Sequence, residues 1–83
     1  MKNEILTKEE REYLSCVIKP FRDRVMNIVK YKSFCNNKEE YIAIYYYRND
    51  MFIECVKLAI FEEGAMYNNM EINKTYTKED LKL

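Results

Sequence analysis

The feature that most constrains this chain is a long apolar and aromatic block at residues 41–60, YIAIYYYRNDMFIECVKLAI, which a polar tripeptide divides in two. Before the tripeptide, aliphatic and tyrosine side chains alternate, as they do on the two faces of a β-strand. The tripeptide is Arg48-Asn49-Asp50, and Asn and Asp tolerate the positive φ angles that short hairpin turns need. The block therefore predicts a β-hairpin with strands at 41–47 and 51–60 and a short turn between them.

The first strand of this hairpin divides its side chains between two faces. Ile42 and Ile44 share one face, and we expect this aliphatic pair to pack against a helix. The opposite face would carry a stripe of tyrosines, namely Tyr41, Tyr45 and Tyr47. The second strand has apolar residues on both faces, so its register stays open. Residues 52–62 also fit one face of a helix, but a hairpin partner directly before them favours a strand.

A helix precedes the hairpin, and its first turn is clearly marked. Thr7 and Glu10 form the capping-box pattern T-x-x-E, after which apolar residues recur at helical spacing. Pro20 disfavours α geometry at the residue before it. The helix therefore either stops at Pro20 or kinks there and runs one more turn. We prefer the kink, because it keeps Phe21 on the apolar face.

The remaining segments complete an α+β fold. Residues 24–34 alternate as in a strand, which would place Val25, Asn27, Val29 and Tyr31 on one side and Met26, Ile28 and Lys30 on the other. A polar loop follows at 35–40, and Gly64 ends the hairpin. Residues 65–70 form a compact turn or a single helical turn, and 71–76 are irregular or a short strand. Thr77 then opens a last helical turn. We expect one domain, residues 1–83, with an N-terminal helix packed on a small antiparallel three-stranded sheet and a short C-terminal helical turn.

Composition argues against most chemistry. The 14 basic and 14 acidic residues balance, whereas a nucleic-acid binder needs a basic excess on one face. The chain has no histidine, the commonest general base, and a single glycine, too few for a phosphate loop. We therefore expect no enzymatic activity and no cofactor.

The three cysteines predict neither a disulfide framework nor a metal centre. Cys16, Cys35 and Cys55 are odd in number and widely spaced, and without histidine a zinc site would need a carboxylate ligand. We expect free thiols that are buried or partly buried. The charged N-terminus lacks the apolar region of a secretory signal, and no stretch approaches the roughly 20 apolar residues of a membrane helix. These features predict a soluble cytoplasmic protein.

The tyrosine stripe and the polar turn beside it are the candidate binding residues. Tyrosine and arginine are enriched at binding hot spots, so the candidate partner-binding set is Tyr41, Tyr45, Tyr47, Arg48, Asn49 and Asp50. Two other interpretations are open. The stripe can be ordinary cross-strand aromatic packing. It can also stack single-stranded nucleic acid or a nucleotide, together with Lys30, Lys32 and Arg48.

Both ends of the chain resemble small uncharacterised proteins of phages and prophages of Firmicutes. The resemblance rests on TKEEREYLSCVIKPFRDRV at 7–25, on G-x-M-Y-x-x-M-E at 64–71 and on Y-T-x-E-[DE]-L at 76–81. It covers about half of the chain, and residues 32–60 diverge from it. No established activity comes with it.

The resemblance implies a biological context, that of a phage protein in its host, rather than a catalytic activity. By analogy, small phage proteins without catalytic motifs frequently act by binding and blocking one host protein, and anti-CRISPR and other anti-defence inhibitors are the best-known examples. We therefore expect a non-enzymatic phage or prophage accessory protein that binds and inhibits a host protein in the host cytoplasm. A single-stranded nucleic-acid or nucleotide-binding module is the alternative. A homodimer that pairs the hairpin edges is left open.

Overall fold

The computed structural model describes residues 4–33, 40–61 and 67–83. Its elements, in chain order, are α1 (Lys8–Ile18), the 3₁₀ segment η1 (Lys19–Arg24), β1 (Val25–Lys32), β2 (Glu40–Tyr47), β3 (Cys55–Phe61), β4 (Thr75–Tyr76) and α2 (Lys78–Leu81). The strands form one antiparallel sheet in the order β3-β2-β1-β4. The predicted α+β fold is confirmed, with the two-residue β4 added to the three expected strands. The predicted loop at 35–40 and the break at Gly64 fall almost entirely outside the described residues.

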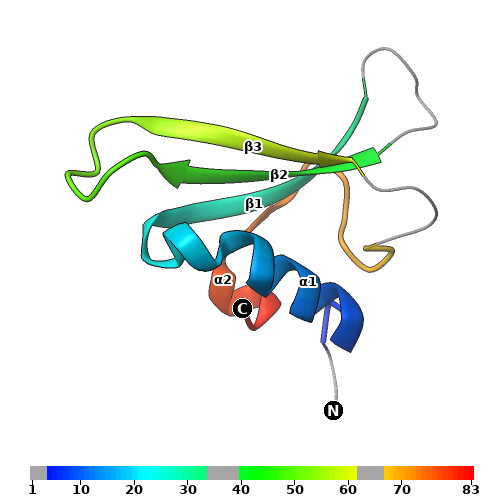
Figure 1. Ribbon diagram of the computed structural model, residues 1–83. Helices are drawn as coiled ribbons and strands as arrows, with labels where there is room; N and C mark the ends of the chain where they lie inside the picture. The colour runs from blue at the N-terminus through cyan, green and yellow to red at the C-terminus, as the bar shows by residue number, and fades with distance from the viewer. Residues whose placement is uncertain (1–3, 34–39, 62–66) are drawn as a thin grey trace.

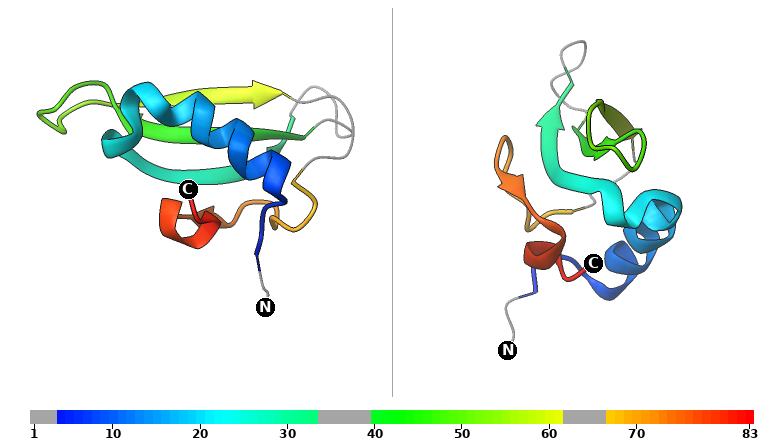
Figure 2. Two further views of the ribbon diagram at one scale, coloured as in Figure 1. Left: turned by 60° about the horizontal axis from the view of Figure 1, so that its bottom comes forward. Right: turned by 90° about the vertical axis from the view of Figure 1, so that its left-hand side faces the viewer.

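Both helices lie on one face of the sheet (Figures 1 and 2). Between the helices and the sheet lies the core, which contains Leu14 and Ile18 from α1 and Ile28, Ile42 and Ile44 from β1 and β2. The predicted orientation of the Ile42 and Ile44 face is therefore confirmed. Of the described elements, none lies over the opposite face of the sheet. No helix in the described ranges is both long enough and apolar enough to span a membrane.

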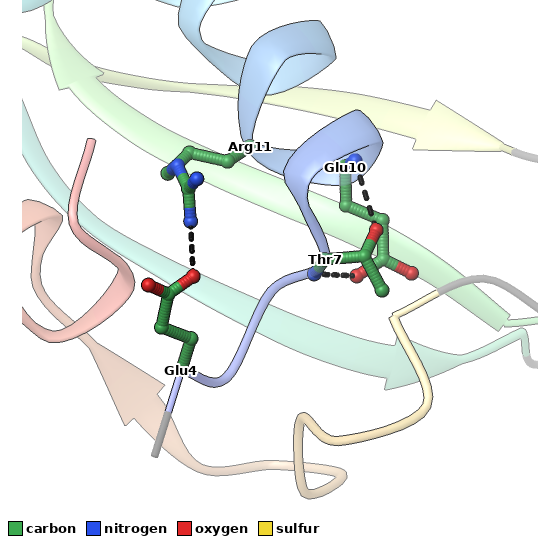
Figure 3. A network of polar contacts seen from close by, with 4 residues as sticks. All are labelled: Glu4, Thr7, Glu10 and Arg11. Carbon is green, nitrogen blue, oxygen red and sulfur yellow. Dashed lines mark hydrogen bonds and ion pairs between the residues drawn. The ribbon is translucent and has the colours of Figure 1, made fainter. Parts of the chain in front are cut away.

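The first helix begins and kinks where local signals predict. The Thr7 hydroxyl accepts a hydrogen bond from the Glu10 amide at 3.1 Å, and the Glu10 carboxylate accepts one from the Thr7 amide at 2.9 Å (Figure 3). After Ile18 the α-helix gives way to η1, which contains Pro20 in its first turn and is interrupted at Phe21 (φ −134°). The Phe21 ring stacks on Tyr46 of β2, with centroids 3.9 Å apart. The preferred kinked continuation is thus confirmed. The aromatic contact between Phe21 and Tyr46 holds the extra turn against the sheet.

Strand β1 departs from the predicted alternation at its start. Val25 pairs with Tyr46 and Asn27 with the adjacent Tyr45, so Met26 is an extra residue in a β-bulge. The bulge turns Val25 to the helix side, where it packs against the core. The expectation that Val25 shares a face with Asn27 is therefore wrong. A bulge is a property of the strand pair, and the sequence of one strand does not reveal it.

Two buried charged side chains hold the backbone of Tyr67 from opposite sides. The Glu10 carboxylate accepts a hydrogen bond from the Tyr67 amide at 2.7 Å, and the Lys30 ammonium donates one to the Tyr67 carbonyl at 2.9 Å. Tyr67 has a left-handed backbone (φ 59°) and is 2% exposed, while Glu10 and Lys30 are 6% and 5% exposed. Lys30 also pairs with Glu40 at 3.1 Å. We call Glu10, Lys30 and Tyr67 the Tyr67 clamp, since together they fasten the closing segment to α1 and β1.

Candidate partner-binding surface

The connection between β2 and β3 is a seven-residue loop, Arg48–Glu54, rather than the predicted three-residue turn. The Arg48 amide donates to the Glu54 carbonyl at 2.8 Å, which extends the ladder of the hairpin by one pair. Inside the loop, the Asn49 side chain accepts a hydrogen bond from the Met51 amide at 2.9 Å. This Asx-type contact bends the chain locally. The loop projects beyond the body of the molecule (Figure 1, left).

Three consecutive apolar side chains are exposed in this loop. The exposed fractions are 67% for Met51, 55% for Phe52 and 77% for Ile53. Phe52 has a left-handed backbone (φ 56°), which costs a non-glycine residue on the order of 1–2 kcal/mol. Its ring meets that of Tyr47 edge-on at 5.2 Å. We call residues 47–54 the hairpin tip, because their backbone and aromatic contacts hold an apolar surface toward solvent.

The hairpin tip contains four of the six predicted binding residues. Arg48, Asn49 and Asp50 are exposed and directly precede the apolar residues in the loop. Tyr47 is half-buried, and its ring contacts that of Phe52. The Asp50 carboxylate lies 3.4 Å from the Arg24 guanidinium, a contact that joins the tip to the end of η1.

Sequence reasoning missed the apolar part of the tip. It placed Met51, Phe52 and Ile53 in the return strand, which begins only at Cys55. Three apolar residues in a row without alternation were the available signal, because a half-buried strand would alternate. The strand assignment itself is confirmed for 55–60. There Leu58 and Ile60 pack on the core, and Lys57 and Ala59 are exposed on the other face.

The other two predicted residues, Tyr41 and Tyr45, lie on the open face of the sheet. There they lie beside Tyr31 of β1 and Lys57 of β3. We call these four residues the tyrosine face. The hydroxyls of Tyr31 and Tyr45 are hydrogen-bonded at 3.0 Å, and the ring of Tyr31 lies 5.6 Å from that of Tyr41. The Lys57 ammonium lies 5.8 Å from the Tyr41 ring centroid, within cation–π range.

Small side chains lie between these tyrosines and are buried by them. Ala43 and Val29 are paired across β2 and β1 on this face, and they are 0% and 4% exposed although no described element covers the face. The Tyr31–Tyr45 hydroxyl contact therefore closes over them. The hydrogen bond to Tyr45, together with desolvation, raises the pKa of Tyr31 above its ordinary value of 10.0. Tyr31, Tyr41 and Tyr45 are all half-buried, so the tyrosine face is largely packed against itself.

A shallow depression of about 430 Å³ opens beside these rings. Its lining comprises Tyr31, Lys32, Ser33, Tyr41, Tyr45, Lys57 and Asn73. Among the described residues, the lining offers two ammonium groups, Lys32 and Lys57, and no carboxylate. Lys30, predicted to act on this face, is instead buried on the opposite side in the Tyr67 clamp, and Arg48 lies at the hairpin tip, where it pairs with Glu54 at 3.7 Å. The predicted basic set of Lys30, Lys32 and Arg48 is therefore not brought together.

The described cysteines also differ from expectation. Cys16 and Cys55 are free, but both are exposed rather than buried. Cys35 lies outside the described residues. In the described parts of the chain, no three Asp, Glu or Cys residues gather where they could hold a metal ion.

Comparison with known proteins adds no relative: no protein-family model, no curated protein and no solved structure matches this chain.

Proposed function

We propose that this chain is a small phage or prophage accessory protein that binds and inhibits a host protein, with the hairpin tip as its principal contact surface. The observation that carries the proposal is the exposure of Met51, Phe52 and Ile53 on a projecting loop. Exposed apolar surface of this kind on a small protein marks an interaction site. Burying one such side chain contributes roughly 1.5–3 kcal/mol, so three of them can anchor a complex.

The backbone of the tip supports the same proposal. Phe52 holds a left-handed conformation that a bulky residue avoids, and conformations of this kind cluster at binding sites. The edge-on contact with the Tyr47 ring restrains Phe52, which reduces the entropy lost when a partner binds. Arg48, Asn49 and Asp50 supply the polar rim that surrounds an apolar hot spot in protein interfaces.

The setting of the proposal comes from the resemblance of the chain ends to phage proteins. Under it, the protein acts without catalysis in the host cytoplasm, and its target is an immune effector such as a CRISPR nuclease complex. The test is interference in a host with active CRISPR immunity, with and without expression of this chain. We expect expression to restore phage plating, and the double variant Phe52→Ser/Ile53→Ser to abolish the effect.

The control is Tyr13→Ser, which removes an exposed aromatic from α1, far from the tip in sequence and 46% exposed. It should inhibit as well as the wild type. Circular dichroism would establish that both variants fold. Equal inhibition by the wild type and the double variant would show that the tip is not the contact surface. Unimpaired immunity with the folded wild type would reject the proposed target class.

A second candidate function is binding of single-stranded nucleic acid on the tyrosine face. The lining of the depression favours it, because Lys32 and Lys57 can contact phosphates beside aromatic rings that can stack bases. Two phosphate contacts would give a log–log salt slope of roughly −1.4. Fluorescence anisotropy with a labelled oligothymidine measures this slope, and Lys57→Ala should weaken binding. Absence of binding at low salt would exclude this candidate.

A further inference from the structure

Strand β3 forms one edge of the sheet. The strand order β3-β2-β1-β4 leaves its outer side without a partner strand among the described residues. Its seven residues, Cys55–Phe61, contain no proline, and Lys57 is their only charge. Natural proteins usually shield such an edge with charges, prolines or bulges. The opposite edge, β4, is only two residues long.

The hydrogen bonding of the hairpin shows which backbone groups of β3 point outward. The Arg48 amide donates to the Glu54 carbonyl, so residues 48 and 54 form a hydrogen-bonded pair. Such pairs alternate along an antiparallel ladder. Residues 54, 56, 58 and 60 therefore turn their backbone groups toward β2. Residues 55, 57, 59 and 61 direct their N–H and C=O groups away from the sheet.

We propose that β3 pairs antiparallel with β3 of a second copy of this chain, about a twofold axis at Leu58, so that the two sheets join into one. In this register Lys57 lies opposite the partner's Ala59, and both residues have outward backbone groups. On the helix side, Val56 lies opposite the partner's Ile60, and Leu58 lies opposite the partner's Leu58. All seven residues are paired, and the apolar row that packs on the core continues across the axis.

Charge and hydrogen bonding select this register over its neighbours. A shift of two residues in one direction places Lys57 opposite the partner's Lys57, and like charges in that position repel. A shift of two in the other direction pairs only residues 57–61 of each strand, whereas the proposed register pairs all seven residues of β3. A shift of one residue sets outward backbone groups against inward ones, so the ladder cannot form. The edge is therefore self-complementary in one register, and this favours a second copy over an unrelated strand.

The pairing has a consequence for the hairpin tip. Because the strands run antiparallel, the tip that precedes β3 in one copy lies at the far end of the joined sheet from the tip of the other. The dimer would present two tips at opposite ends, each free to bind. The dimer does not depend on the proposed function, and its test uses no partner protein.

The experiment places opposite charges at Ala59, which is exposed on the open face. Ala59→Glu would face Lys57 of the partner at two symmetric positions, and Ala59→Lys would oppose it at both. We expect the dimer dissociation constant to fall roughly twofold to thirtyfold in the first variant and to rise by a similar factor in the second. Sedimentation velocity over a concentration series measures both shifts. The control pair is Thr75→Glu and Thr75→Lys, at an exposed position of the opposite edge, and it should leave the constant unchanged.

The double variant Lys57→Glu/Ala59→Lys restores the attraction and should dimerise more tightly than Ala59→Lys alone. A wild-type chain that stays monomeric throughout the series would overturn the proposal. Two Ala59 variants that shift the constant in the same direction would overturn it as well, because that result places Ala59 opposite itself or away from the interface.

Discussion

The closing segment, residues 67–83, buries its large apolar side chains, whereas the hairpin tip, residues 47–54, exposes them. In the closing segment, Tyr67, Met70, Tyr76 and Leu81 are at most 3% exposed. In the tip, three successive apolar residues are more than half exposed. Both segments hold an aromatic residue in a left-handed backbone, but Tyr67 is clamped by two buried charges whereas Phe52 rests on one aromatic ring.

This contrast separates what maintains the fold from what is available for binding. The two ends of the chain supply buried residues, such as Tyr67 and Leu81, and the capping residues of α1 and α2. Their pattern is therefore explained by packing and hydrogen bonding. None of the described core residues belongs to the hairpin tip. Specificity for a partner can therefore vary at the tip without loss of the core.

The largest expected effect on stability comes from breaking the Tyr67 clamp. Glu10→Ala removes half of the capping box and leaves the buried Tyr67 amide without its acceptor. The free energy of unfolding should fall by about 2–4 kcal/mol, the sum of a lost cap and an unsatisfied buried donor. Urea denaturation followed by circular dichroism measures this change. Glu9→Ala, at an exposed position of the same turn, is the control and should cost less than about 0.5 kcal/mol. Equal losses in the two variants would contradict the clamp.

An intermediate effect is expected on the tyrosine face. Tyr45→Phe removes the hydroxyl that bonds Tyr31 and should cost about 0.5–1 kcal/mol at neutral pH. The pKa of Tyr31 is raised in the folded state, so this stabilisation is complete below about pH 10 and is lost as the pH rises through the raised value. The melting temperatures of the wild type and Tyr45→Phe should therefore converge above pH 10. Tyr13→Phe, on the exposed side of α1, is the control. A gap that persists at high pH would show that the Tyr31–Tyr45 contact is not responsible for it.

The smallest expected effect on stability is at the tip. Phe52→Gly loses the edge contact with Tyr47 but removes the strain of the left-handed backbone. The free energy lost with the contact and the free energy gained from the backbone are of similar size. The free energy of unfolding should change by less than about 0.5 kcal/mol in urea denaturation. A loss of several kcal/mol would mean that the tip is part of the folding core, and the contrast with the clamp would fail.

Much of the fold could be predicted from the sequence, but only part of the candidate site. Tyr41, Tyr45 and Tyr47 were placed on the correct face, because period-two alternation is a strong local signal. Their packing against one another was left open, since it depends on Tyr31, which arrives from another strand. The apolar tip was missed because the length of a hairpin loop follows from where the ladder ends, and that point lies between Arg48 and Glu54.

The sequence by itself determined the elements whose signals are local. Thr7 with Glu10 and Thr77 with Asp80 begin their helices through bonds that span three residues, so both starts could be predicted from the sequence alone. Only the tertiary structure decided the position of Lys30. Its charge could be buried because the Tyr67 carbonyl, 37 residues away in the chain, and the Glu40 carboxylate meet it there. A buried charge requires partners from distant segments, and no pattern around Lys30 reveals them.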